Sequence, residues 1–141
     1  MNSSNLKKIS SFLFLITALI TSCKKEAGEG GTSGITGRIV ERNYGGSFPA
    51  PFYTDYGAQS EDVYIIYGTN DTLVGNRVRT SYNGEYEFKY LQKGSYTIFV
   101  YGEDTNFITP SPSGKIVVKQ VVEIKDKKST VSVPDLMIIK L

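Results

Sequence analysis

Histidine and tryptophan are absent from the 141 residues of this chain, and cysteine occurs once, at Cys23. Without histidine, the chain cannot build a catalytic triad around an imidazole base, and it lacks a common zinc ligand. A single cysteine cannot form a disulfide within the chain. We therefore expect no catalytic activity, no metal and no cofactor, and a stability that depends on the packed core alone.

An excess of charge of one sign is also lacking. The chain has 16 basic and 14 acidic residues, and two of the basic ones, Lys7 and Lys8, lie in the N-terminal segment, which contains no acid. The remainder is balanced. Nucleic-acid binding requires a basic surface that neutralises phosphates, so the sequence predicts no nucleic-acid partner.

Carboxylate pairs are the remaining route to catalysis. The adjacent acids are Glu61 with Asp62 and Glu103 with Asp104. Neighbours in a strand point to opposite faces of the sheet, so neither pair can easily share a substrate. The acids also lack the spacing of a recognised calcium loop. We predict no catalytic or metal site.

Residues 1–22 have the features of an export signal. Lys7 and Lys8 precede an apolar run over residues 12–20, which is shorter than the roughly 20 residues that a spanning helix needs. The sequence Ile20-Thr21-Ser22-Cys23 is similar to the lipobox of bacterial lipoproteins. We predict that residues 1–22 are removed and that acyl chains on Cys23 anchor the protein to the membrane. The alternative is an ordinary signal peptide with an unrelated cysteine.

The residues after the lipobox predict a tether. Residues 23–33 are polar and rich in glycine and have no apolar periodicity, which is typical of a flexible linker. Lys24 stands where an aspartate favours inner-membrane retention in one class of bacteria. We therefore expect an exported protein that is lipid-anchored to the cell envelope, at the outer membrane, and a single domain over residues 34–141.

From Gly34 onward, apolar residues alternate with polar ones in short runs between turn residues, and no stretch has helical periodicity. The pattern predicts an all-β domain, and seven strands suit a two-sheet sandwich. The predicted strands are Ile35–Arg42, Asp62–Tyr67, Arg77–Ser81, Glu85–Tyr90, Ser95–Tyr101, Lys115–Lys125 and Val131–Lys140, the last interrupted by Pro134.

The clearest alternation lies in Glu85–Tyr90, where Tyr86, Phe88 and Tyr90 share one face. Asn83-Gly84 before this strand is a strong hairpin signal, because both residue types tolerate positive φ. In the following strand, residues 96–100 are expected to lie in the core.

This central region resembles the carboxypeptidase regulatory-like domain. The family's pattern of turn glycines and alternating aromatic and aliphatic residues is matched by Thr80, Gly84, Tyr86, Phe88, Leu91, Gly94, Tyr96 and Ile98. The resemblance covers most of residues 34–141 and implies a transthyretin-like, seven-stranded β-sandwich without chemistry of its own. The motif residues are turn and core positions, so the resemblance supports a fold more than a function.

The chain departs from this family between the first two strands, where residues 43–60 form an unusually long connection. It is rich in aromatic residues: Tyr44, Phe48, Phe52, Tyr53 and Tyr56. Long irregular connections are often functional, and exposed rings suit stacking on sugars or gripping a peptide. The alternative is that these rings fold back and cover the end of the sandwich. A second aromatic face, with Phe99 and Tyr101, is expected to pack against residues 106–110.

The sequence thus predicts an envelope lipoprotein that acts as a non-catalytic accessory or protein-interaction module. The alternative function is a surface lipoprotein that binds a glycan or a peptide through the aromatic loop over residues 44–56. The expected partners are the membrane, through the lipid anchor, and either an envelope protein or a carbohydrate.

Overall fold

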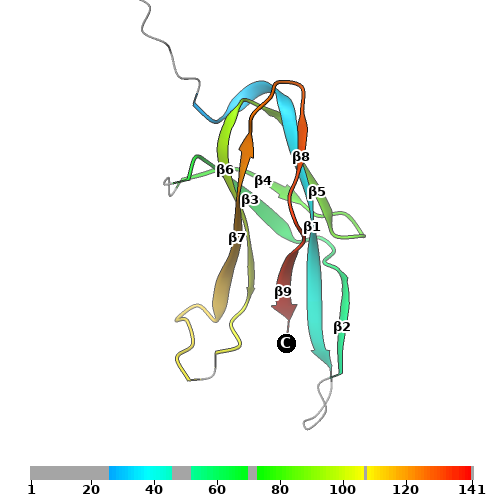
Figure 1. The fold of residues 1–141 in the computed structure, drawn as a ribbon. Helices are drawn as coiled ribbons and strands as arrows, with labels where there is room; N and C mark the ends of the chain where they lie inside the picture. The colour runs from blue at the N-terminus through cyan, green and yellow to red at the C-terminus, as the bar shows by residue number, and fades with distance from the viewer. Residues whose placement is uncertain (1–25, 46–51, 70–72, 107, 141) are drawn as a thin grey trace, which may run out of the picture.

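The computed structural model describes residues 26–45, 52–69, 73–106 and 108–140, and within these ranges it contains nine β-strands and no helix. It follows that no described helix is long and apolar enough to cross a membrane. The strands form two sheets that pack face to face as a β-sandwich (Figure 1). The predicted signal segment and Cys23 lie outside the described residues.

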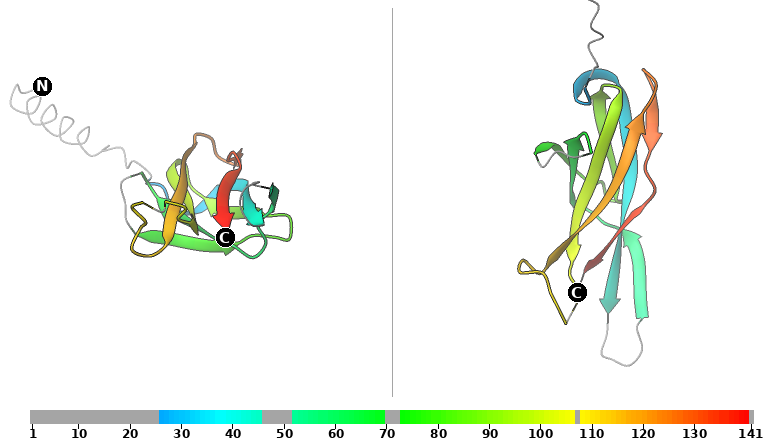
Figure 2. Two further views of the ribbon diagram at one scale, coloured as in Figure 1. Left: turned by 90° about the horizontal axis from the view of Figure 1, so that it is seen from below. Right: turned by 60° about the vertical axis from the view of Figure 1, so that its left-hand side comes forward.

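One sheet is built around a single long strand, β1 (Glu29–Gly45). Its first half lies between β5 (Glu85–Leu91), which is antiparallel, and β8 (Thr130–Ser132), which is parallel. Its second half lies between antiparallel β2 (Phe52–Gly57) and parallel β9 (Leu136–Lys140). Because β1 runs the whole length of the molecule, its start and the β1–β2 hairpin lie at opposite ends (Figures 1 and 2).

The second sheet has four antiparallel strands in the order β4-β3-β6-β7. They are β3 (Asp62–Tyr67), β4 (Val74–Arg79), β6 (Gly94–Glu103) and β7 (Lys115–Ile124). β6 pairs with β7 along all ten residues of each strand.

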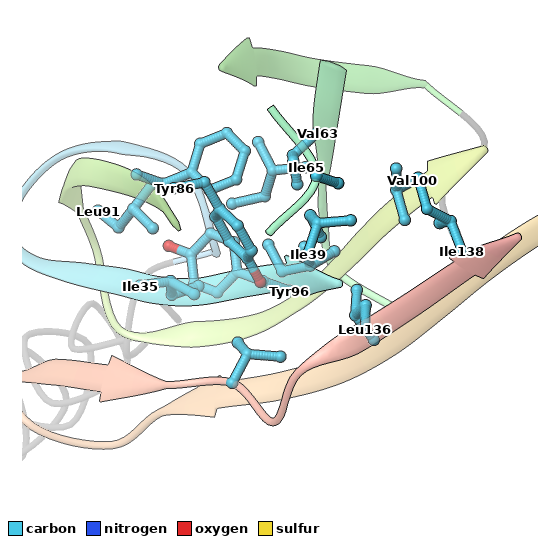
Figure 3. Close-up of a cluster of buried hydrophobic side chains, with 14 of the residues drawn as sticks. Ile35, Ile39, Val63, Ile65, Tyr86, Leu91, Tyr96, Val100, Leu136 and Ile138 are labelled. Atoms are coloured by element: carbon cyan, nitrogen blue, oxygen red, sulfur yellow. The ribbon is translucent and has the colours of Figure 1, made fainter. Parts of the chain in front are cut away.

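The core fills the space between the sheets (Figure 3). Its fully buried side chains alternate along the strands, as with Tyr96, Ile98 and Val100 on β6, and this confirms the predicted core segment. The motif residues Tyr86 and Phe88 are buried as predicted. The remaining core members come from both sheets and from the segments next to their strands: Ile35, Ile39, Ala58, Val63, Ile65, Leu91, Ile124, Val133, Leu136 and Ile138.

Apart from the predicted strand Arg77–Ser81, which is found at Val74–Arg79, four details differ from the sequence expectations. The first is the strand count, which is nine instead of seven. One added strand, β2, comes from the connection that was expected to be irregular. The other arises because the predicted last strand is split into β8 and β9 around Pro134, the residue expected to interrupt it. Proline has no backbone N–H for a sheet ladder, so the interruption has a direct chemical cause.

The second difference concerns the predicted flexible linker, of which residues 29–33 belong to β1. The glycines in this segment permit close packing. A Cβ atom on Gly31 would lie 1.8 Å from the carbonyl oxygen of Leu91, so only glycine allows the strands to approach here. The hydroxyl of Tyr96 also accepts a hydrogen bond from the Gly28 N–H at 3.0 Å, which attaches the segment to the domain just before β1.

The third difference is Tyr90, which was expected beside Tyr86 and Phe88 but is 72% exposed. Its φ is 59°, a left-handed conformation that breaks the strict alternation of the strand. Leu91 is buried in its place.

The fourth difference is the role of the turn at Asn83-Gly84. Gly84 has the predicted positive φ, at 81°, but the strands on either side of the turn belong to different sheets. The turn therefore carries the chain from one layer of the sandwich to the other and does not close a hairpin.

Candidate functional site

Four of the five predicted aromatic residues lie on the antiparallel strands β1 and β2, which replace the ends of the connection that was expected to be irregular. Tyr44 and Tyr53 are paired across the hairpin, and Phe52 opposes Gly45. Phe48 lies outside the described residues, as do the side chains of the other three. Tyr56 is the one predicted residue whose side chain is described.

The hairpin is held by a bidentate ion pair between Arg42 and Asp55, which oppose each other on β1 and β2. The Nε and Nη2 atoms of Arg42 each lie 2.7 Å from a carboxylate oxygen of Asp55. Hydrogen bonding to Arg42 lowers the pKa of Asp55. The pair fixes the two strands directly beside Tyr56.

Tyr56 is oriented by its hydroxyl and keeps its ring accessible. The hydroxyl donates to Oε1 of Glu41 at 3.1 Å and accepts from Nδ2 of Asn43 at 3.4 Å. The residue is 43% exposed. The alternative in which this ring folds back and is hidden at the end of the sandwich is therefore wrong for Tyr56.

A second tyrosine, Tyr82, lies in the turn between the sheets and is 78% exposed. The turn is fixed against β1, because the Ile39 N–H donates to the Gly84 carbonyl at 2.8 Å. A Cβ atom on Gly84 would lie 2.3 Å from the Ile39 carbonyl oxygen, so glycine is required for this approach. The close contact presents Tyr82 next to the β1–β2 hairpin.

Tyr56 and Tyr82 line one groove of about 460 Å³ together with four polar residues, Arg38, Glu41, Gln59 and Asn83. We refer to these six residues as the tyrosine groove. Among the described residues, no aliphatic side chain lines it. Its surface therefore consists of two aromatic rings surrounded by hydrogen-bond donors and acceptors, and its volume is within the usual range of small-molecule sites.

Below the groove, Glu41 belongs to a network of charges. It is 7% exposed, and Nζ of Lys140 lies 3.1 Å from its carboxylate and 2.5 Å from that of Glu61. Burial alone would lower the pKa of Lys140, but its hydrogen bonds to the two carboxylates raise it overall. The network places the Lys140 ammonium beside the carboxylate that accepts the Tyr56 hydrogen bond.

Arg38 forms the rim of the groove on the side of the turn. Its Nε donates to the Asn83 carbonyl at 3.0 Å, and its Nη1 lies 4.0 Å from Asp135. The guanidinium is about half exposed, so it retains N–H groups that can face a ligand.

Sequence reasoning identified only Tyr56 among these six residues. Tyr82 and Asn83 belong to the turn that the Asn83-Gly84 pattern predicts. That pattern indicates a backbone conformation and does not indicate a ligand contact. Arg38, Glu41 and Gln59 carry no local signal, because their shared position depends on the contact between the turn and β1.

The predicted acidic pairs do not form paired carboxylates. Glu61 contacts Lys140, whereas Asp62 pairs with Arg77 and Arg79 on the neighbouring strand. Asp104 accepts backbone hydrogen bonds from residues 106 and 111, which lower its pKa. Within the described residues, no three acids or cysteines are grouped closely enough to hold a metal ion.

The second aromatic face lies on the outer side of the β3–β6–β7 sheet. Phe99 stacks on Tyr64 with ring centroids 5.0 Å apart, and Tyr101 contacts Phe99 edge to face at 5.6 Å. Residues 106–110 were expected to pack against this face. Residues 108–110 of this segment are all exposed, so they do not cover it. The rings instead cover one another.

Comparisons with known proteins show structural similarity alone. No protein-family model matches the chain. No curated protein matches it. One solved structure with a similar arrangement is that of a candidate carbohydrate-binding protein from Pseudomonas aeruginosa, with 14% sequence identity and a TM-score of 0.49, covering 79% of this chain and 91% of that one. At this level of similarity, the neighbour indicates nothing about the ligand of this protein.

Proposed function

We propose that this protein is a lipid-anchored lipoprotein of the cell envelope whose β-sandwich binds a carbohydrate in the tyrosine groove and has no catalytic role. The observation that carries the proposal is the composition of the groove. Two accessible tyrosine rings and four polar side chains line one hollow, and no aliphatic side chain of the described residues joins them. Sugar rings present apolar C–H faces and hydroxyl edges, and both kinds of surface find counterparts here.

The same composition favours a carbohydrate over a peptide. A peptide is bound through pockets for its apolar side chains or through pairing with a strand edge. The tyrosine groove offers polar groups and rings instead. Arg38, Gln59 and Asn83 can donate hydrogen bonds, and the side-chain carbonyls of Gln59 and Asn83 can accept them.

The position of the groove suits a tethered protein. Cys23 precedes the first described residue by only three positions, and β1 begins at Glu29. At about 3.3 Å per residue, Arg38 lies roughly 30 Å along β1 from that start. An anchor at Cys23 would hold the start of β1 close to the membrane. The groove and the β1–β2 hairpin would then lie at the end of the domain that is farther from the membrane.

The proposal also includes the resemblance to the carboxypeptidase regulatory-like domain, which concerns the β-sandwich scaffold and not the ligand contacts. Its motif residues occupy turns and the core, where Tyr86 and Phe88 are almost fully buried. A scaffold of this kind supplies rigidity, and none of the six residues of the tyrosine groove is one of the eight motif residues.

The binding test uses a glycan array followed by titration of the best oligosaccharide into the purified full chain. We expect Tyr82→Ala to weaken binding at least tenfold, because stacking rings are the side chains whose loss costs most at binding sites. Tyr90→Ala is the matched control, since Tyr90 is also strongly exposed but lies outside the groove. Equal affinities for both variants and the unaltered chain would exclude the groove.

The anchoring test is independent of the ligand. Cys23→Ser removes the only thiol, so the variant should no longer incorporate labelled fatty acid and should leave the membrane fraction. If the variant fractionates with membranes as the unaltered chain does, the lipoprotein assignment is wrong.

A second candidate function is an accessory role in which the domain binds an envelope protein. The observation that favours it is the exposure of apolar side chains on β7, where Val117 and Val121 are each about half exposed. These valines lie on the sheet opposite the one that contains β1, so both functions can be present in one molecule.

A further inference from the structure

The longest sheet edge in the described part of the molecule belongs to β7. All ten residues of β7 pair with β6, and no other described strand pairs with β7 (Figure 1). Unpaired N–H and C=O groups along such an edge can accept a further strand. By contrast, the edge strand β5 has seven residues and presents Glu85, Glu87 and Lys89.

The outer face of β7 continues into the second aromatic face. Val117 is paired with Tyr101, Lys119 with Phe99 and Val121 with Thr97. These six residues line a shallow groove of about 250 Å³, together with side chains of β3 and the segment after it. A strand added beside β7 would place every second side chain along the side of this groove.

The charges on β7 indicate which strand would fit. Lys115 pairs with Glu103, and Nζ of Lys125, the residue after β7, lies 3.7 Å from Glu123. Lys119 stands between Val117 and Val121 on the same face, and it has no ion pair among the described residues. An acidic side chain directly opposite Lys119 would provide the missing partner.

From these observations, we infer that β7 binds an extended segment of a partner protein as an added strand. The segment carries an acidic residue opposite Lys119 and apolar residues two positions away on either side, opposite Val117 and Val121. This inference deepens the second candidate function, on which it rests, and does not depend on carbohydrate binding.

A second copy of this chain fits the edge less well. An antiparallel pair of β7 strands related by a twofold axis through Lys119 opposes the two lysines, and an axis through Gln120 opposes Lys119 with Val121. An axis through Val121 opposes Lys119 with Glu123, but Glu123 already contacts Lys125, and this register opposes Val117 with Lys125. A lysine in an edge strand disfavours such self-pairing. The twofold axis also reverses the long axis of one copy, so the starts of the two β1 strands lie at opposite ends of the dimer. The two lipid anchors, which precede β1, would then not reach the same membrane.

The test uses two blocked seven-residue peptides and the purified full chain in detergent. The first peptide is Thr-Val-Thr-Glu-Thr-Val-Thr, and the control peptide has lysine in place of glutamate. We expect the glutamate peptide to bind about tenfold more tightly in calorimetry. Lys119→Glu should reverse this preference, because only the charge at the centre of the edge has changed.

Amide hydrogen exchange shows where the peptide binds. The glutamate peptide should slow exchange along β7 and leave β5 unchanged. Tyr82→Ala should bind the peptide normally, and Lys119→Glu should bind the oligosaccharide normally, so each function can fail without the other. Failure of both peptides to bind, equal affinities for the two peptides, unchanged exchange in β7, or a dimer of the full chain in sedimentation would each overturn the inference.

Discussion

The same substitution, tyrosine to phenylalanine, should have opposite effects on stability at two buried positions. Tyr96 and Tyr86 are 0% and 4% exposed and face the core from the two different sheets. The hydroxyl of Tyr96 is fully partnered, whereas that of Tyr86 is buried without a hydrogen-bond partner in the described structure. Each variant loses only a hydroxyl oxygen, so the comparison isolates the contribution of the hydroxyl hydrogen bonds to the free energy of unfolding.

For Tyr96→Phe, the structure predicts destabilisation. The hydroxyl accepts from the Gly28 N–H at 3.0 Å and lies 2.7 Å from the Gln92 carbonyl, to which it can donate. Both backbone groups lose this partner in the variant. Leaving a buried backbone group unpaired costs about 1–3 kcal/mol, and because Gly28 and Gln92 are only partly buried we expect the lower end of this range; the loss also frees the segment that precedes β1.

For Tyr86→Phe, the structure predicts a stability that is unchanged or higher by about 1 kcal/mol. Burial without compensation disfavours the hydroxyl, and the same desolvation, with Asp135 nearby, raises the pKa of Tyr86. Removing the oxygen removes that cost. The assay is urea unfolding followed by circular dichroism, in which the midpoints should shift in opposite directions at a constant slope. If both midpoints fall by the same amount, the assignment of the two hydroxyls is wrong.

The remaining predictions concern a turn and a charge network. Gly84→Ala should cost about 3 kcal/mol or more, because its Cβ would lie 2.3 Å from a carbonyl oxygen, whereas Gly114→Ala, also at positive φ but with no atom within 4 Å, should cost about 1 kcal/mol. Urea unfolding measures both, and equal costs would contradict the close packing of the turn. The pKa of Lys140 is raised in the folded state. The stabilisation by its charged side chain is therefore fully present below the pKa of the unfolded chain, about 10.4, and is lost as the pH rises through the pKa of the folded state. Lys140→Met should therefore destabilise the protein more at pH 7 than at pH 12, and a pH-independent difference would contradict this.

Most of the fold follows from local patterns in the sequence. The strand over residues 62–67 is found as predicted, and the predicted β5, β6 and β7 agree with the structure to within two residues at each end. Alternation is sufficient for β3, β5 and β6 because one face of each is buried in the core, whereas β7 has only Ile124 buried. The early start of β1 could not be predicted, since the glycines of residues 28–34 resemble a linker and their role is visible only against Leu91.

The candidate site was much less predictable. Tyr56 and Tyr82 are 26 positions apart in the chain, and they meet because the turn at Gly84 packs against Ile39. The Asn83-Gly84 pattern predicts a backbone conformation, but not which strands the turn connects. Similarly, the exposed Tyr90 shows that a single residue with positive φ can reverse an otherwise clear alternation.

The most direct test of carbohydrate binding in the tyrosine groove is nuclear magnetic resonance of the full chain with its ten tyrosines carbon-13 labelled. The oligosaccharide selected on the array is titrated into the protein, and each ring signal is assigned by a tyrosine-to-phenylalanine variant. We predict that the ring signals of Tyr56 and Tyr82 shift with a common saturation curve while that of Tyr90 stays in place. Saturable shifts confined to other tyrosines, or no shift for any tyrosine, would contradict the account.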